Sequence, residues 1–259
     1  MNPWTQRSIE CANRSDYLDR LFLVYPCTPD GDRPIDHTRW RCVEAAFNNN
    51  DNRELLQQLL QLELFPIKDS YVAYFKRDPL ALQRNPGTVA RLCARLRELG
   101  LQELYVRCTQ PKETNRQIGP LFRRWMGTGA LGAPVLTEPE FLADNRDAVL
   151  AGSDSQLMTF ARQHLDYDGQ KGLDIIARFN RRFVVGEAKF LTDFGGHQNA
   201  QFNDAKTLLQ SSRVRAQKIA VLDGVLYIPS QNQMFRFLKE NPHLNIMSAL
   251  ALPEFLRQI

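Results

Sequence analysis

The chain has 259 residues, of which 43% are hydrophobic and 24% charged, and these proportions exclude a collagen-like, coiled-coil or wholly disordered protein. The formal net charge of +4 permits a polyanionic partner without requiring one. The five cysteines are widely spaced and form no C-x-x-C pair, and no apolar run is long enough for a signal peptide or a membrane span. We therefore expect reduced thiols and a cytoplasmic protein.

The first half of the chain is predicted to be mainly helical. Apolar residues are spaced three and four apart over residues 17–25, 40–47 and 53–65, and prolines separate these segments. A further helix is expected to begin at Thr88 as its cap and to end at Gly100.

A glycine-rich segment marks the most favourable boundary in the chain. Residues 127–134 (GTGALGAP) contain three Gly and one Pro in eight positions, which disfavours regular structure. We therefore predict a mainly helical part over residues 1–134 and an α/β part over 135–259, although the two can also form one continuous domain.

The second half of the chain is predicted to be α/β, with a mixed central sheet flanked by helices. Residues 173–179 and 183–190 are short β-rich runs around Asn180 and Arg181, which is typical of a hairpin. Downstream, we expect helices at 199–209 and 234–238 and strands at 218–222 and 226–228.

The hairpin can be given a register from its turn. If the turn is centred on Asn180 and Arg181, Asp174 lies opposite Glu187, and two like charges so placed are destabilising unless a cation lies between them. Alternation places Lys189 on the same face as Glu187. The opposite face is then apolar, formed by Val184, Gly186, Ala188 and Phe190.

Asp174, Glu187 and Lys189 together indicate a metal-dependent hydrolytic site. Magnesium takes oxygen ligands, usually one or two carboxylates completed by water and substrate phosphate, and Asp174 and Glu187 supply such a pair. Lys189 can orient or deprotonate an attacking water and counter the charge on a phosphoryl group. The pattern favours phosphodiester hydrolysis, although an E-x-K triplet also occurs by chance in strands that bind no metal.

The segment GLDIIARFNRRFVVGEAKF (172–190) resembles the metal-binding hairpin of the PD-(D/E)xK nuclease superfamily. Its continuation into a Gly-rich loop and a helix is similar to type II restriction endonucleases, over roughly residues 153–227 and more loosely 111–125. The resemblance implies a restriction-endonuclease-like core, with Asp174, Glu187 and the backbone carbonyl of Ala188 as metal ligands and Lys189 as the catalytic lysine. Leu173 stands where the proline of the superfamily motif would be.

Asp154 is a further candidate for the metal site. An acidic residue from a helix upstream of the hairpin often completes sites of this superfamily. The alternative is that Ser153 or Asp154 serves as the N-cap of a helix that continues to residue 165.

Two segments carry candidate DNA contacts. Gln198, Asn199 and Gln201 follow the catalytic strand, and amides can pair with the major-groove edge of adenine; the alternative is a solvated loop before a helix. Basic residues gather in residues 107–125, where interleaved amides are typical of a DNA-facing surface; the alternative is a solvated helix face. The candidates in that segment are Lys112, Asn115 and Arg116.

We therefore predict a Mg²⁺-dependent type II restriction endonuclease that acts on double-stranded DNA, with residues 1–134 helping to grip the duplex. A palindromic target requires a two-fold symmetric homodimer. The alternatives are a DNA repair or recombination nuclease of the same superfamily, and a catalytically inactive DNA-binding module.

Overall fold

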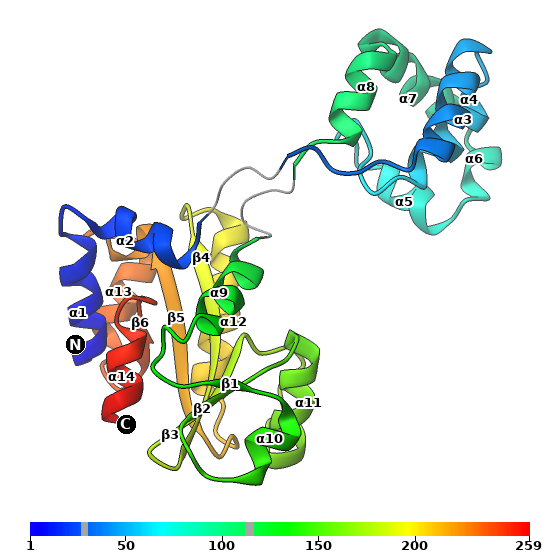
Figure 1. Ribbon diagram of the computed structural model, residues 1–259. Coiled ribbons are helices and arrows are strands. Elements are labelled where there is room, and N and C mark those ends of the chain that lie inside the picture. The colour runs from blue at the N-terminus through cyan, green and yellow to red at the C-terminus, as the bar shows by residue number, and fades with distance from the viewer. Residues whose placement is uncertain (27–30, 112–116) are drawn as a thin grey trace. The chain divides into compact units, whose positions relative to one another are not determined.

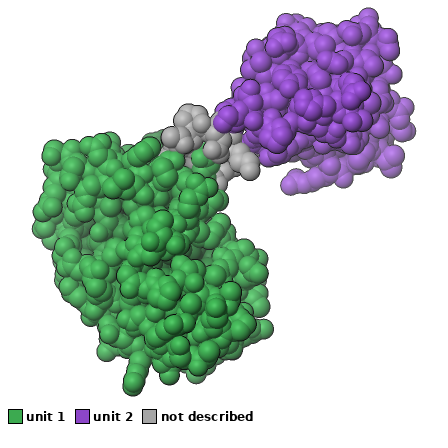
Figure 2. Space-filling model, in the orientation of Figure 1, with its two compact units in different colours: residues 1–27, 114–259 green, residues 28–113 purple. Residues whose placement is uncertain are grey.

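The computed structural model describes residues 1–26, 31–111 and 117–259 (Figure 1). The chain forms two compact units (Figure 2). Unit 1 comprises residues 1–27 and 114–259, and unit 2 comprises residues 28–113. No helix in these described ranges is long and apolar enough to cross a membrane.

Unit 2 is helical and has a core of its own. Its helices are α3 (His37–Asn48), α4 (Asn52–Leu60), α5 (Val72–Arg77), α6 (Ala81–Arg84), α7 (Pro86–Leu99) and α8 (Leu101–Cys108). Asp36 and Asp51 cap α3 and α4 by accepting hydrogen bonds from backbone N–H groups three residues on. The apolar faces of these helices bury residues that include Trp40, Leu55, Leu59, Leu92, Leu96 and Leu104.

The predicted helices of unit 2 are confirmed, but two of their ends are wrong. The helix predicted to run to residue 65 ends at Leu60. Leu62 is buried in the core although it lies in a bend after the helix, so an apolar residue at this position does not indicate that the helix continues. The cap predicted at Thr88 lies inside α7, which begins at Pro86, a residue whose fixed φ favours the first helical position. Gly100, with φ of 78°, ends α7 as predicted.

Unit 1 is built on a mixed sheet in the order β1-β2-β3-β4-β5-β6. Its strands are β1 (Val135–Leu136), β2 (Ala148–Leu150), β3 (Ile175–Phe179), β4 (Arg182–Leu191), β5 (Gln217–Gly224) and β6 (Asn245–Met247). The pairs β2–β3 and β3–β4 are antiparallel, whereas β1–β2, β4–β5 and β5–β6 are parallel. This arrangement confirms the predicted α/β class and is compatible with a restriction-endonuclease-like core.

Helices flank this sheet on both faces. On one face, Tyr25 after α2 (Tyr17–Val24) packs its ring against Phe122 of α9 (Ile118–Gly127) and against Phe190 of β4. On the other face, α10 (Glu138–Ala143) and α11 (Asp154–His164) pack on Ile176 and Val185. The remaining helices are α1 (Pro3–Ala12), α12 (Gly196–Gln210), α13 (Gln233–Glu240) and α14 (Leu252–Gln258), of which α12 lies against β4 and β5.

The predicted division between residues 134 and 135 differs from the one that the structure shows. Residues 127–134 form a turn between α9 and β1 inside unit 1, where Gly129 and Gly132 both have φ of 80°. The helices before this turn bury Tyr17, Leu21 and Phe122 in the same core as the sheet. The glycines therefore mark a tight turn, and the mainly helical unit is the shorter segment 28–113.

A second prediction, a strand over residues 226–228, is wrong. Residues Val225–Tyr227 form a short 3-10 helix, η2. Gly224 has φ of 99° and turns the chain out of β5, and a Cβ atom there would lie 2.1 Å from the Leu191 carbonyl oxygen. This turn overrides the β preference of the residues that follow it.

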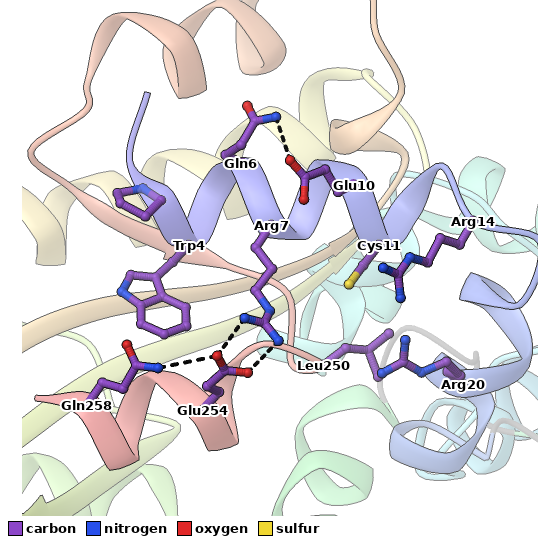
Figure 3. A pocket seen from close by; sticks show the side chains of 11 residues that line it. Trp4, Gln6, Arg7, Glu10, Cys11, Arg14, Arg20, Leu250, Glu254 and Gln258 are labelled. Atoms are coloured by element: carbon purple, nitrogen blue, oxygen red, sulfur yellow. Dashed lines mark hydrogen bonds and ion pairs between the residues drawn. The ribbon is translucent and has the colours of Figure 1, made fainter.

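Buried polar groups join the N-terminal helices to the end of β5. The Asp223 carboxylate, at the end of β5, accepts hydrogen bonds from the Tyr25 hydroxyl at 2.9 Å and the Ala249 N–H at 3.1 Å. Burial raises the pKa of Asp223 to about 6, although these hydrogen bonds act in the opposite direction. An ion pair between Arg7 and Glu254 joins α1 to α14 (Figure 3).

Candidate active site

The β3–β4 hairpin has the predicted turn and register. Its two-residue turn is formed by Asn180 and Arg181, whose φ values of 48° and 63° are those of a type I′ turn. Ile175 pairs with Gly186, and the pairing continues to the turn without a slip. The Asn180 side chain also donates hydrogen bonds to two carbonyl groups at the C-terminus, which ties the turn to the end of the chain.

Asp174 lies one residue before β3, where the regular ladder ends. Its N–H donates to the Gly186 carbonyl at 3.0 Å, and its carboxylate Oδ2 accepts the N–H of Ala188 at 2.8 Å. The side chain thus takes the position of the next ladder bond. The backbone of β4 thereby fixes the position of this carboxylate.

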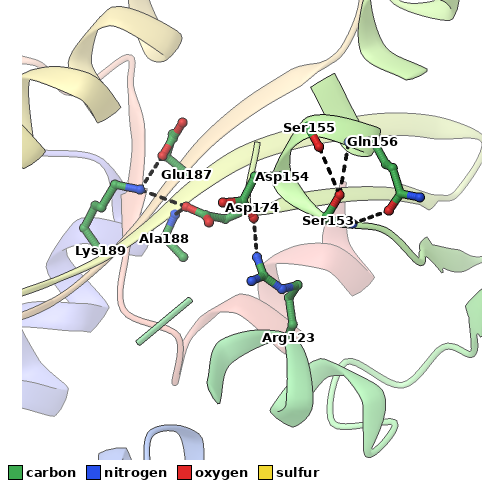
Figure 4. A network of polar contacts seen from close by, with 9 residues as sticks. All are labelled: Arg123, Ser153, Asp154, Ser155, Gln156, Asp174, Glu187, Ala188 and Lys189. Atoms are coloured by element: carbon green, nitrogen blue, oxygen red, sulfur yellow. Dashed lines mark hydrogen bonds and ion pairs between the residues drawn. The ribbon is translucent and has the colours of Figure 1, made fainter. Parts of the chain in front are cut away.

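The three predicted catalytic side chains converge (Figure 4). The Nζ atom of Lys189 lies 2.9 Å from Asp174 Oδ2 and 2.5 Å from Glu187 Oε2. Both acidic residues are buried, with Asp174 6% and Glu187 4% exposed. The structure therefore brings together the residues that alternation in the sequence placed on one face.

The charges of this cluster are incompletely balanced. Burial raises the pKa of Glu187 to about 7, and the charge of Asp174 adds to the effect while Lys189 opposes it. Burial lowers the pKa of Lys189, but the two carboxylates outweigh burial and raise it above its ordinary value. Lys189 is therefore an ammonium group, and one positive charge is shared by two buried carboxyl groups.

Two members of this cluster, Asp174 and Lys189, line a cleft of about 270 Å³, whereas Glu187 lines a separate pocket. Because β3 pairs with β4 only as far as Gly186, the part of β4 that carries Lys189 continues past the end of its neighbour. Helices close the cleft from both sides of the sheet, with Gly119 and Arg123 from α9, Asp154 from α11 and Gln201 from α12 among the lining residues.

Asp154, the further candidate for the metal site, lies in the same cleft as Asp174 and Lys189. Ser153 is the N-cap of α11 and forms a capping box with Gln156, so the alternative of a helix cap is confirmed for Ser153. Asp154 follows it, lines the cleft and forms an ion pair with Arg123 (Figure 4). Within the described part of the chain, no group of three or more His, Cys, Asp or Glu side chains has a metal-binding arrangement.

The three amide side chains predicted to contact DNA have different surroundings in the structure. Helix α12 begins at Gly196, three residues before its predicted start, so Gln198 and Asn199 lie in its first turn. Gln198 is buried and brackets Thr192, accepting from its N–H at 3.3 Å and donating to its hydroxyl at 3.2 Å. Asn199 donates to the Phe194 carbonyl at 3.1 Å. These two side chains hold the loop together.

Gln201 is the predicted amide that lines the cleft, and its Nε2 lies 3.2 Å from Nε2 of His197. Lys112, Asn115 and Arg116 lie outside the described residues. Sequence reasoning assigned no individual role to Arg123, because its only signal was membership of the basic segment 107–125. Its place in the cleft depends on how α9 packs against the sheet, which local spacing does not encode.

Comparison with known proteins gives one family. The family model described as Tsp45I type II restriction enzyme matches residues 2–259 and so spans both units. No curated protein and no solved structure matches the chain. Because this match covers essentially the whole chain, the chain belongs to the Tsp45I type II restriction enzyme family and is a site-specific endonuclease.

Proposed function

We propose that the enzyme hydrolyses phosphodiester bonds of double-stranded DNA at the cluster of Asp174, Glu187 and Lys189, with Mg²⁺ as its metal. The observation that carries this proposal is the convergence of two buried carboxylates on one ammonium group, of which Asp174 and Lys189 also line an open cleft. Family membership supports the reaction, and the cluster supports its location.

The residues present fit a magnesium ion. Their donor atoms are carboxylate oxygens, and Mg²⁺ is usually held by one or two carboxylates together with water and substrate phosphate. Burial raises the pKa of Glu187, so a cation bound beside this carboxyl group would favour its charged form. We include Asp174 and Glu187 in the binding set and leave out Asp154, because Arg123 already neutralises it.

The backbone carbonyl of Ala188 completes the proposed set of protein ligands. In an antiparallel ladder a residue exchanges both of its backbone bonds with the same neighbouring strand, so its N–H and C=O point to one side. The N–H of Ala188 points to Asp174, and its carbonyl oxygen is therefore directed to the same side of β4. A bound Mg²⁺ would polarise the phosphodiester and lower the pKa of the attacking water.

Lys189 contributes as a protonated group. Its raised pKa favours hydrogen-bond donation to the water or the phosphoryl oxygens over removal of a proton from the water. A fixed ammonium group beside the phosphorus atom stabilises the negative charge that develops in the transition state. The expected products carry 5′-phosphate and 3′-hydroxyl ends.

The rest of the proposal concerns the partners of this site. Unit 2 and the segment with Lys112, Asn115 and Arg116 grip the duplex, while Gln201 contacts it from within the cleft. Two copies act together on a palindromic target, because each strand needs its own active site. A cytoplasmic location is consistent with the free thiols of the four described cysteines, Cys11, Cys42, Cys93 and Cys108.

Plasmid digestion tests the proposed function. Wild-type protein incubated with Mg²⁺ should give discrete bands whose sequenced ends share one target, and omission of the metal should abolish them. Asp174→Asn should remove cleavage while Glu240→Gln, a carboxylate exposed at the end of α13, should leave it unchanged. A smear without a shared target would favour a repair or recombination nuclease, and binding without cutting would favour an inactive DNA-binding module.

A further inference from the structure

We propose that Arg123 is a further substrate-contacting residue, whose guanidinium group binds a phosphate of the DNA strand being cut, and that Asp154 positions it. The inference rests on the proposed nuclease site, because it places a phosphate in the same cleft. It concerns a residue for which neither the sequence motif nor the family match supplies a role.

The guanidinium group borders the same small space as the catalytic carboxylate. A Cβ atom added to Gly119 would lie 3.9 Å from both Nη atoms of Arg123 and 3.9 Å from Oδ1 of Asp174. The same cleft is lined by Lys189. A cationic side chain and the proposed metal ligand Asp174 thus lie on either side of the position that a side chain at Gly119 would take, within the same cleft.

Asp154 holds Arg123 in this position through a rigid connection. Asp154 is the first residue of α11, which the Ser153 capping box fixes, and its carbonyl accepts the N–H of Leu173 at 3.2 Å. Leu173 directly precedes Asp174. At Gly172 a Cβ atom would lie 2.6 Å from that of Asp154, so the glycine permits this close approach. The partner of Arg123 is therefore anchored to the segment that precedes Asp174.

The chemistry of the pair favours phosphate as the ligand. The hydrogen bond to Asp154 uses Nη1, whereas a guanidinium group has five N–H donors and can bind a second oxyanion in bidentate geometry. The Arg123 side chain is 32% exposed and that of Asp154 is 56% exposed, so the cation faces the open cleft. It also offsets the repulsion that the acidic cluster exerts on a phosphate backbone.

A structural role for the same pair predicts something different. Ion pairs with this exposure contribute little to stability, so the loss of a purely structural pair should leave both folding and cleavage nearly unchanged. Arg7 provides the matched control, because it joins α1 to α14 through Glu254 with side chains 50% and 30% exposed. It does not line the catalytic cleft.

The test compares Arg123→Gln, Asp154→Asn and Arg7→Gln in the full chain. The probe is a duplex that contains the target read from the ends of wild-type plasmid fragments, cut under single-turnover conditions with Mg²⁺. Loss of one preorganised donor in a transition state costs about 100-fold or more in rate, and we expect that loss for Arg123→Gln. Asp154→Asn should lose about 10-fold, because the cation stays but its position is less fixed, and Arg7→Gln should stay within about twofold.

A second measurement identifies the phosphate. Metal-free binding of a plasmid-length duplex is measured against salt concentration, where each neutralised phosphate adds about 0.9 to the slope of log K against log salt. The slope should fall by about that amount in Arg123→Gln and stay unchanged in Arg7→Gln. Equal cleavage by these two variants would overturn the inference, as would a lost activity accompanied by an unchanged slope.

The two proposals fail separately. If Asp174→Asn cuts as well as wild type, the proposed catalytic site is wrong, whereas the salt dependence of Arg123→Gln still decides whether Arg123 binds a phosphate. If Asp174→Asn is inactive and Arg123→Gln cuts like wild type, the catalytic site stands and the role of Arg123 is rejected.

Discussion

The Asp174 carboxylate accepts the backbone N–H of Ala188 at 2.8 Å, at the point where the pairing of β3 with β4 ends. This bond joins the two strands through a side chain where a further ladder bond would stand. It holds the Asp174 carboxylate beside Glu187 and Lys189, the two residues that flank Ala188 in β4. The preorganisation of the site therefore depends on the exact packing of these strands.

Gly186 makes this packing testable. A Cβ atom at Gly186 would lie 2.6 Å from a carbon of Ile219 and 2.8 Å from one of Ile175. Gly186→Ala should therefore destabilise unit 1 by about 1–3 kcal/mol through overpacking and should lower cleavage by shifting Asp174 relative to Glu187. Urea denaturation and single-turnover cleavage measure the two effects.

The control for that substitution is Gly196→Ala. Gly196 begins α12 and has open space around the position of a Cβ atom. This variant should be as stable as wild type or more stable by up to about 1 kcal/mol. If both alanine variants behave alike, the tight contact of β4 with its neighbours does not hold the site.

Two glutamines of α12 should have separable roles. Gln198 is buried and bonded to Thr192, so Gln198→Ala should lower the melting temperature by loosening the loop after β4. Gln201 lines the cleft, so Gln201→Ala should keep the melting temperature and lower the affinity for DNA. Thermal unfolding and DNA titrations check both, and an exchange of the two phenotypes would reject this assignment.

Metal affinity should depend on pH through Glu187. Its pKa of about 7 without metal means that the carboxyl group is largely neutral below that pH and must lose a proton before it can bind a cation. Mg²⁺ should therefore bind about 10-fold more weakly at pH 6 than at pH 8, with proton release at the lower pH. Calorimetry in buffers of different ionisation enthalpy measures both quantities. Equal affinity and no proton release at pH 6 would contradict the prediction.

Asp223 should make stability fall as the pH rises. Its pKa is raised to about 6 by burial, so the folded state holds the proton more tightly than the unfolded chain does. Its contribution is complete below about pH 4 and is lost as the pH rises through 6, by about 3 kcal/mol at about 1.4 kcal/mol per unit of pKa. Because Asn does not titrate, the unfolding free energy of Asp223→Asn relative to wild type should increase by that amount between pH 4 and pH 8. A difference that is constant with pH would show that Asp223 titrates normally.

The convergence of Asp174, Glu187 and Lys189 could be predicted because its geometry is local. A two-residue turn at Asn180 and Arg181 fixes the register, and the alternation of a strand then places Glu187 and Lys189 on one face. The stripe that α7 buries in unit 2 follows from helical spacing in the same way. Neither result depends on segments remote in sequence.

The features that were not predicted depend on contacts between residues that are far apart in the sequence. Tyr25 hydrogen-bonds to Asp223 across 198 positions of sequence, and such contacts assign the N-terminal helices to the sheet unit. Arg123 meets Asp154 only because α9 and α11 close on the same end of β4. The prediction of a strand after Gly224 was wrong, because the turn that this crowded glycine makes outweighs the β propensity of the residues that follow it.

Anomalous diffraction from crystals grown with Mn²⁺ and a target duplex is the most direct test of the proposed metal centre. Mn²⁺ shares the oxygen-ligand preference of Mg²⁺ and scatters strongly enough to be located. The anomalous peak should lie between the carboxylates of Asp174 and Glu187, with the Ala188 carbonyl as a third ligand and a DNA phosphate beside it. A peak elsewhere in the protein, with both carboxylates still bonded to Lys189, would contradict the account.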